Sequence, residues 1–243
     1  MSGKDSSILK SKHAARASYT GAAVFDALTS EYDDWFEEEG KLIFAIEVRA
    51  FRESLASLPK PWLEIGVGSG RFAQALGIET GIDPSAKLLG LANKRGVSVC
   101  LGRGEQQAFS AMSFGTVFLI STLCFVNSAS NVLKEAYRIL VADGKLILGL
   151  VPKESPWGRF YELKKKRGHR FYKYTTFYSY NEVVELLHQA GFSIEKVIST
   201  LFQKPSEVEH MESPHEAFSP DAGFVVIVAR KDRSKSAWPA LMR

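Results

Sequence analysis

Residues 62–73 are the stretch that most constrains the fold of this chain. An apolar strand pattern breaks there into three closely spaced glycines, Gly66, Gly68 and Gly70, and a helical pattern follows. Glycine has no Cβ atom, so it lets the backbone turn sharply, expose its N–H groups and approach a bulky ligand closely. The stretch therefore predicts a strand–loop–helix unit that cradles a nucleotide-type cofactor.

The glycine spacing and two nearby acids narrow the choice of cofactor. A dinucleotide-binding fingerprint needs its third glycine one position later, where Arg71 stands, so NAD binding is disfavoured. Glu64 lies inside the strand, where an ionised carboxylate is costly unless it meets a cation or a donor, such as a ligand's ammonium group. Asp83 ends the next predicted strand, 17 residues after Gly66, where a carboxylate commonly binds ribose hydroxyls.

Together these residues resemble the class I S-adenosylmethionine-dependent methyltransferases of the type 11 group, which is similar to the quinone-biosynthesis and other small-molecule methyltransferases. The resemblance runs roughly from Tyr32 to Arg230. It implies an α/β fold, a Rossmann-like three-layer sandwich with a seven-stranded, mostly parallel sheet and an antiparallel C-terminal hairpin. It also implies S-adenosyl-L-methionine as cofactor and in-line methyl transfer to a small-molecule acceptor.

The resemblance also implies roles for individual residues. The matches to Glu64 and the three glycines line the methionine part of the cofactor, and the match to Asp83 holds the ribose hydroxyls. A Tyr-Asp-x-Trp-Phe element similar to residues 32–36 caps the cofactor in the family, although these rings fit a plain core equally well, and Thr122 equally fits an ordinary capping hydroxyl. The expected cofactor site comprises Tyr32, Glu64, Gly66, Gly68, Gly70, Asp83, Pro84, Gly104, Glu105 and Thr122.

Two positions depart from the family pattern. Arg103 stands where an acidic residue usually reads the adenine ring, which leaves adenine recognition to the backbone around Gly104 and to Glu105 or Gln106. Gly115 stands where relatives usually carry Asp. These departures leave open a non-catalytic protein that merely retains the fold.

Residues 152–180 form an insertion that is too long for a plain connection. They carry a net charge of +6 and many aromatic side chains, which argue against disorder. In the resembled family such an insertion faces the methyl acceptor, so we expect an acceptor-side lid; a basic strip that holds RNA or acidic protein is the rival interpretation. His169 or a tyrosine of the insertion is a candidate base, but a solvated surface histidine is favoured, and no catalytic residue is assigned.

Length and charge bound the remaining possibilities. A chain of 243 residues with 45% hydrophobic content suits one domain, expected over residues 21–231, between mobile tails at 1–20 and 232–243. The net charge is +4, but residues 1–20 contribute +3 and residues 230–243 contribute +4. The remaining body carries −3, so a nucleic-acid-binding face is not indicated.

Other classes are disfavoured by what the chain lacks. No apolar run reaches the ~18 residues of a membrane span, and no secretory signal is evident, so a cytoplasmic location is expected. Cys100 and Cys124 lie in apolar runs and are expected to be buried, reduced thiols. No metal-ligand spacing is present, because His210 and His215 lack cysteine neighbours. The oligomeric state and the identity of the acceptor do not follow from the sequence.

Apolar periodicity and turn residues predict the order of elements. A helical start at 24–36 is followed by helices at 42–58, 71–76, 86–95, 130–140 and 181–190, and by strands at 62–65, 78–83, 97–101, 116–121, 145–151, 192–202 and 223–229.

Overall fold

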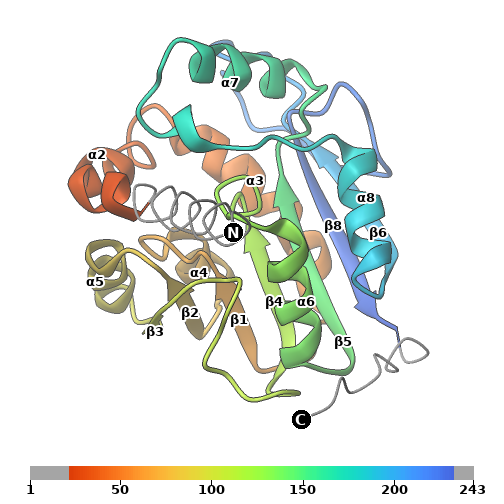
Figure 1. Ribbon diagram of the computed structural model, residues 1–243. Helices are drawn as coiled ribbons and strands as arrows, with labels where there is room; N and C mark the ends of the chain where they lie inside the picture. The colour runs from red at the N-terminus through yellow and green to blue at the C-terminus, as the bar shows by residue number, and fades with distance from the viewer. Residues whose placement is uncertain (1–21, 233–243) are drawn as a thin grey trace, which may run out of the picture.

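The computed structural model describes residues 22–232; the expected tails at 1–20 and 232–243 lie outside this range, except for Asp232. Its centre is one sheet with the strand order β3-β2-β1-β4-β5-β8-β6-β7 (Figure 1). The five strands from β3 to β5 run parallel, whereas β8 pairs antiparallel with both β5 and β6. The strands are β1 Trp62–Ile65, β2 Thr80–Asp83, β3 Ser98–Leu101, β4 Phe114–Ile120, β5 Leu140–Leu150, β6 Phe192–Thr200, β7 His215–Glu216 and β8 Phe224–Lys231.

The predicted Rossmann-like architecture is confirmed, including the antiparallel C-terminal strands, but the sheet has eight strands instead of seven. The additional strand, β7, is only two residues long and pairs with Ile198 and Ser199 at the sheet edge. A strand this short has no period that a sequence pattern can reveal.

Helices cover both faces of the sheet. Helices α3, α4 and α5 contribute one hydrophobic cluster, which includes Phe51 and Phe118, and α6 and α8 contribute the other, which includes Val117 and Leu133. Adjacent residues of β4 thus enter opposite layers, as expected where successive side chains alternate across a sheet. None of the helices in the described range is long and apolar enough to cross a bilayer. The helices are α2 Thr29–Asp34, α3 Lys41–Leu55, α4 Arg71–Leu76, α5 Ala86–Lys94, α6 Ala129–Ile139, α7 Pro156–Lys166 and α8 Tyr180–Gln189, with a 3₁₀ turn, η1, at Tyr172–Tyr174.

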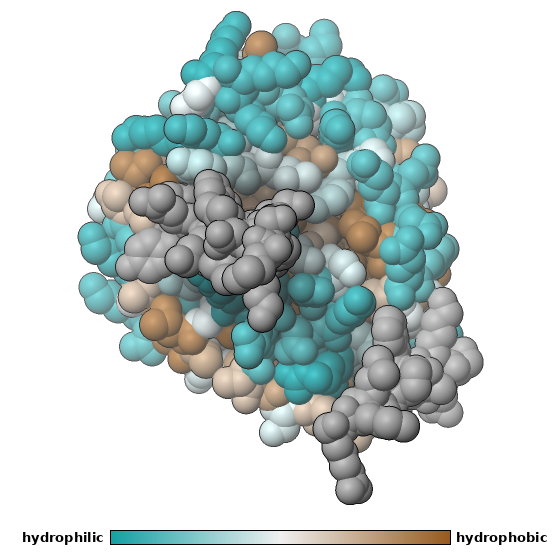
Figure 2. All heavy atoms as spheres, in the orientation of Figure 1, coloured by the Kyte–Doolittle hydropathy of each residue, from teal (hydrophilic) through white to brown (hydrophobic). Residues whose placement is uncertain are grey.

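The insertion is folded and lies across one end of the sheet, where α7 crosses above α3 and β5 (Figure 1). Ser155 caps α7 by accepting a hydrogen bond from the Gly158 N–H at 2.9 Å. Trp157 is 3% exposed, and its Nε1 donates to the Gln203 carbonyl at 2.8 Å, which fixes α7 to the loop after β6. The outer side of α7 is mainly hydrophilic (Figure 2).

Gly115 has a structural role that explains its departure from the family pattern. Its N–H donates to the Pro61 carbonyl at 2.9 Å, at the point where β4 enters the sheet. A Cβ atom built on Gly115 would lie 2.4 Å from the Pro59 carbonyl oxygen and 2.6 Å from the Lys60 carbonyl oxygen. Because these contacts are with backbone, no rotamer change relieves them.

We therefore expect Gly115→Ala to lower the free energy of unfolding by about 1–3 kcal/mol, the usual cost of overpacking. Gly90→Ala is the control, because that position is exposed within α5 and a new Cβ would meet nothing within 4 Å. The control should be unchanged or up to about 1 kcal/mol more stable, since alanine favours helix. Denaturant unfolding of both variants measures the contrast, and equal stability would contradict the steric argument.

Candidate functional site

A cavity of about 890 Å³ opens at the carboxyl ends of the parallel strands. Gly66, Asp83 and Ser121 bring the ends of β1, β2 and β4 to its wall. Residues of α2, α3 and the insertion line the opposite parts. Open α/β sheets bind ligands at this edge, and the volume lies within the usual range of small-molecule sites.

The glycine loop is shaped for close approach. Gly66 and Gly68 both line the cavity and have φ values of 75° and 53°. A Cβ atom on Gly66 would lie 2.4 Å from the Thr122 side chain, and one on Gly68 would lie 3.2 Å from the Tyr32 hydroxyl. Side chains at these two positions would therefore be strained and would fill the cradle.

Gly70 is not part of the cavity wall. It precedes α4 with φ of 81°, and a Cβ atom there would lie 2.8 Å from the Ala92 Cα atom. The described structure thus gives Gly70 a packing role, the close approach of α4 to α5.

Two buried carboxyls face the cavity beside this loop. Glu64 is 2% exposed, and its Oε2 atom has no hydrogen-bond partner among residues 22–232. Burial, and then the negative charge of Asp83, raise the pKa of Glu64 well above its usual range. Neither acid forms an ion pair with a described residue, so a ligand carrying donors or positive charge fits the space between them.

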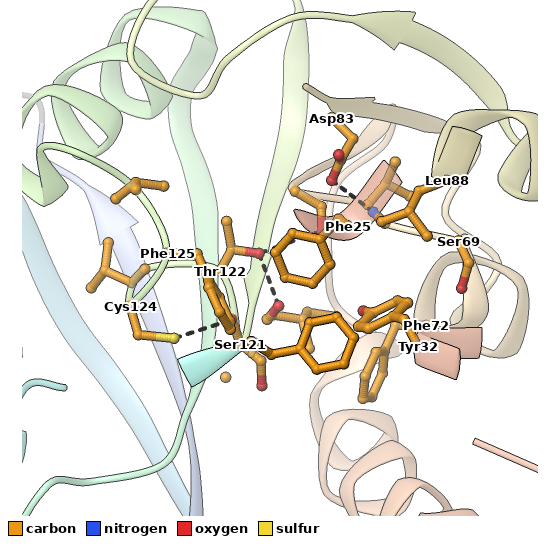
Figure 3. A pocket seen from close by; sticks show the side chains of 18 of the residues that line it. Phe25, Tyr32, Ser69, Phe72, Asp83, Leu88, Ser121, Thr122, Cys124 and Phe125 are labelled. Atoms are coloured by element: carbon orange, nitrogen blue, oxygen red, sulfur yellow. Dashed lines mark hydrogen bonds between the residues drawn. The ribbon is translucent and has the colours of Figure 1, made fainter. Parts of the chain in front are cut away.

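Asp83 is bound to the loop that it faces. Its Oδ2 atom accepts a hydrogen bond from the Gly68 N–H at 3.0 Å, and its Oδ1 atom accepts one from the Ser85 N–H at 2.8 Å. Burial raises the pKa of Asp83 to about 6, although these two hydrogen bonds oppose the shift. Figure 3 shows Asp83 and Ser69 on one side of the cavity, Cys124 on the other, and Phe25 and Tyr32 between them.

Helix α2 holds Tyr32 over the cavity. The Tyr32 ring packs edge-on against Phe25 at 5.4 Å between centroids. Asp33 anchors the helix, since its Oδ2 atom lies 2.9 Å from the Arg71 Nη2 atom and 2.7 Å from the Arg95 Nη2 atom. Burial alone would raise the pKa of Asp33, but the hydrogen bonds from the two arginines outweigh it and hold the pKa well below its usual value.

The remaining predicted residues also reach the cavity. Pro84, Gly104, Glu105 and Thr122 line it together with the residues above. Glu105 accepts a hydrogen bond from the Asn127 N–H at 2.7 Å through its Oε1 atom, and the Thr122 hydroxyl donates to the Ile120 carbonyl at 2.9 Å. Nine of the ten predicted site residues therefore converge on one cavity, and Gly70 is the exception.

His169 and both cysteines differ in environment from the expectation. His169 is half-buried and lines the cavity, and its Nδ1 atom has no hydrogen-bond partner among the described residues, so it is not the fully solvated histidine that was favoured. Burial lowers the pKa of His169, which favours the neutral imidazole near neutral pH. Cys100 and Cys124 are unpaired and only partly buried. Cys124 lines the cavity, where burial raises the pKa of its thiol to about 12.

Sequence reasoning missed Phe25 and Glu47, which also line the cavity. Phe25 carries no local signal beyond its apolarity. Glu47 does, because it lies on α3 between the buried residues Ile46 and Phe51, at a position where helical spacing predicts an apolar side chain. No group of three or more potential metal ligands occurs within the described range.

Comparisons with known proteins agree on one family. A family model described as a methyltransferase domain matches residues 63–148. A solved structure from Thermotoga maritima, described as an S-adenosylmethionine-dependent methyltransferase and possible histamine N-methyltransferase, is 39% identical with a TM-score of 0.80; the match covers 86% of this chain and 99% of that one.

Two similar relatives are uncharacterized proteins. One from Methanocaldococcus jannaschii is 36% identical over 209 residues, which are 86% of this chain and 98% of the relative. One from Mycobacterium tuberculosis is 38% identical over 200 residues, which are 82% of this chain and 70% of the relative.

The anchoring of α2 yields a prediction about stability. Asp33→Ala removes a carboxylate partner from both Arg71 and Arg95 in a mostly buried site. The free energy of unfolding should therefore fall by about 3 kcal/mol. Asp34→Ala is the control, since that neighbour is exposed.

The effect should also depend on pH. Because the folded-state pKa of Asp33 is depressed, its contribution is complete above the ordinary pKa of about 4 and is lost as pH falls below it. Unfolding curves between pH 3 and 7, chosen to bracket that value of about 4, measure this trend. An equal loss in Asp34→Ala would assign the effect to the helix instead of the ion pairs.

Proposed function

We propose that this chain, which belongs to the S-adenosylmethionine-dependent methyltransferases, transfers the methyl group to a small-molecule acceptor. The observation that carries the proposal is the single cavity, which has the glycine loop and acidic pair at one end and a wall of insertion aromatics at the other. A cofactor and a small acceptor can thus share one cavity.

The residues present fit the cofactor. The unpartnered Oε2 atom of Glu64 offers an acceptor for an ammonium group, and a Cβ atom at Gly66 or Gly68 would fill the cradle. On our proposal, Glu64 and these glycines hold the methionine part, and Asp83 accepts hydrogen bonds from the ribose hydroxyls. Pro84, Gly104, Glu105 and Thr122 complete the wall around the nucleoside, and Tyr32 covers it.

Methyl transfer from a sulfonium requires the protein mainly to align the two reactants. S-adenosylmethionine supplies a methyl group on a cationic sulfur, which is already a good leaving group. The glycine loop and the α2 cap fix one reactant while the insertion fixes the other, and such orientation can contribute about 7–11 kcal/mol to the rate.

The charge distribution favours a small acceptor over RNA. The cavity is lined by eight Asp and Glu residues against three Lys and Arg residues, and four of the acids, Glu31, Asp34, Glu38 and Glu39, are exposed, so the exposed part of the lining disfavours a polyanion. Within the insertion, Lys166 and Arg167 are exposed, whereas the Lys165 ammonium donates to the Thr175 carbonyl. Part of the basic charge therefore supports the local fold. The Thermotoga protein, described as a possible histamine N-methyltransferase, puts amines among the first acceptors to assay.

The placement of Asp83 predicts a loss of cofactor affinity on substitution. Charge-assisted hydrogen bonds contribute about 1.5–3 kcal/mol, so Asp83→Ala should weaken S-adenosylhomocysteine binding by about 10- to 150-fold. The affinity of the unsubstituted protein should also fall as pH drops through about 6, because protonation removes the carboxylate. Calorimetry measures both effects. Asp221→Ala, which removes an exposed carboxylate away from the cavity, is the control, and an unchanged dissociation constant in Asp83→Ala would refute the placement.

The acceptor class predicts where labelled methyl groups appear. In a cell extract with a radiolabelled methyl donor, we expect label in the low-mass metabolite fraction, and ribonuclease treatment should not reduce it. The double variant Lys166→Ala/Arg167→Ala should retain this activity, because both side chains are exposed on the outside of the insertion. Label confined to RNA, with a steep salt dependence and loss in the double variant, would replace the small-molecule acceptor by a nucleic acid.

A further inference from the structure

Glu47 is a buried acid whose place in the fold the cofactor does not explain. It lies on α3, is 8% exposed, and lines the cavity. Its neighbours in the helix, Ile46 and Val48, belong to the hydrophobic core. Within residues 22–232, no side chain or backbone group forms a salt bridge or hydrogen bond with its carboxyl group.

Aromatic rings of the insertion, Tyr161, Tyr172 and Phe177, line the same cavity as Glu47. The negative charge of Glu47 acts on Tyr161 and Tyr172, whose pKa values are raised first by burial and further by that charge, so both hydroxyls stay protonated. The two rings lie 4.7 Å apart between centroids, and Phe177 stacks on Tyr161 at an interplanar angle of 9°. The acid is thus set against an aromatic wall and lies in the part of the cavity formed by the insertion.

An acid in such a position reduces stability unless something binds it. Burial raises the pKa of Glu47 to about 8, which reflects the cost of ionising a carboxyl group away from water. A cation entering the cavity would offset that cost through a charge-assisted hydrogen bond and would also be attracted to the tyrosine faces. An anionic acceptor would be repelled, and a neutral one would leave the acid without a charged partner.

We propose that Glu47 binds the positively charged nitrogen of the methyl acceptor, and that the acceptor is an organic amine whose apolar or aromatic body packs against Tyr161, Tyr172 and Phe177. Where that nitrogen is itself the atom methylated, it first gives its proton to the Glu47 carboxylate, which frees the lone pair that forms the new C–N bond as the C–S bond breaks. This inference rests on the proposed small-molecule acceptor and names its chemical class. Glu47 is here a specificity-determining residue that contacts the substrate.

The test compares two probes of nearly equal shape. Phenethylamine carries an ammonium group where 2-phenylethanol carries a hydroxyl, and binding of each is measured by calorimetry on protein saturated with S-adenosylhomocysteine at a pH about one unit above the Glu47 pKa of about 8. A charge-assisted hydrogen bond predicts that the amine binds about 10- to 150-fold more tightly than the alcohol. A set of smaller and larger primary amines, each paired with its alcohol, extends the comparison if the body of phenethylamine does not fit.

Substitution at Glu47 completes the test. Glu47→Gln should abolish the preference for amines while leaving the affinity for S-adenosylhomocysteine unchanged. Its melting temperature at pH 7 should equal or exceed that of the unsubstituted protein, because an acid whose folded-state pKa is raised destabilises the fold above its unfolded-state pKa. Glu53→Gln, on the exposed side of the same helix, should change neither property.

The outcomes separate this inference from the proposed function. Equal binding of amines and alcohols, failure of every amine to bind, or a preference that survives in Glu47→Gln would overturn the role of Glu47. If metabolites are still methylated in the extract assay, the small-molecule proposal stands without it. Absence of label from the metabolite fraction would instead reject the proposed function itself.

Discussion

The cavity depends on buried carboxyl groups that lack a basic partner. Asp33, in contrast, is buried with two arginines around it, and it serves to hold α2 in place. Glu47, Glu64 and Asp83 are each at most 8% exposed and have no ion pair within residues 22–232. Burying an ionised acid without a counter-ion destabilises the fold, and a bound ligand that donates hydrogen bonds or carries positive charge would offset that cost. The presence or absence of a basic partner thus distinguishes Asp33, which has a structural role, from the three acids that line the cavity.

The cover of the cavity is assembled from segments far apart in the chain. Phe171 of the insertion lies 5.4 Å from Phe25 and 6.1 Å from Tyr32 between ring centroids. Arg170 forms an ion pair with Glu31, at the start of α2. Each exposed ion pair contributes little, but ring packing and charge together join the α2 cap to the insertion. The glycine-loop part of the cavity and the part lined by the insertion therefore share one continuous cover.

Much of this arrangement could be predicted from the sequence. The glycine spacing, Glu64 and Asp83 are local signals, and the parallel order of strands brings them to one edge of the sheet. The role of Gly70 could not be predicted, because it depends on how closely α4 approaches Ala92. The two-residue β7 and the inward position of His169 likewise follow from tertiary packing and have no periodic pattern.

The unusual position of Glu47 could be predicted from the sequence, but its role could not. A charged residue on the apolar side of α3 is visible in the sequence, whereas the aromatic wall that it faces comes from residues more than a hundred positions later. Gly115 shows the opposite case. Its difference from relatives suggested a loss of function, but the contacts with Pro59 and Lys60 show that it is required by packing.

The proposed amine acceptor binds as a cation and the methyl donor is a sulfonium, so two positive charges share one cavity until the amine loses its proton. At a separation of about 6 Å and an effective dielectric constant of about 20, two such charges repel by about 3 kcal/mol. The exposed acids of the cavity lining, Glu31, Asp34, Glu38 and Glu39, reduce this repulsion. Because Glu47 lies with the insertion and Glu64 with the glycine loop, each end of the cavity has its own buried carboxyl. On this proposal, the separation of the two acids orients the two reactants while both carry positive charge.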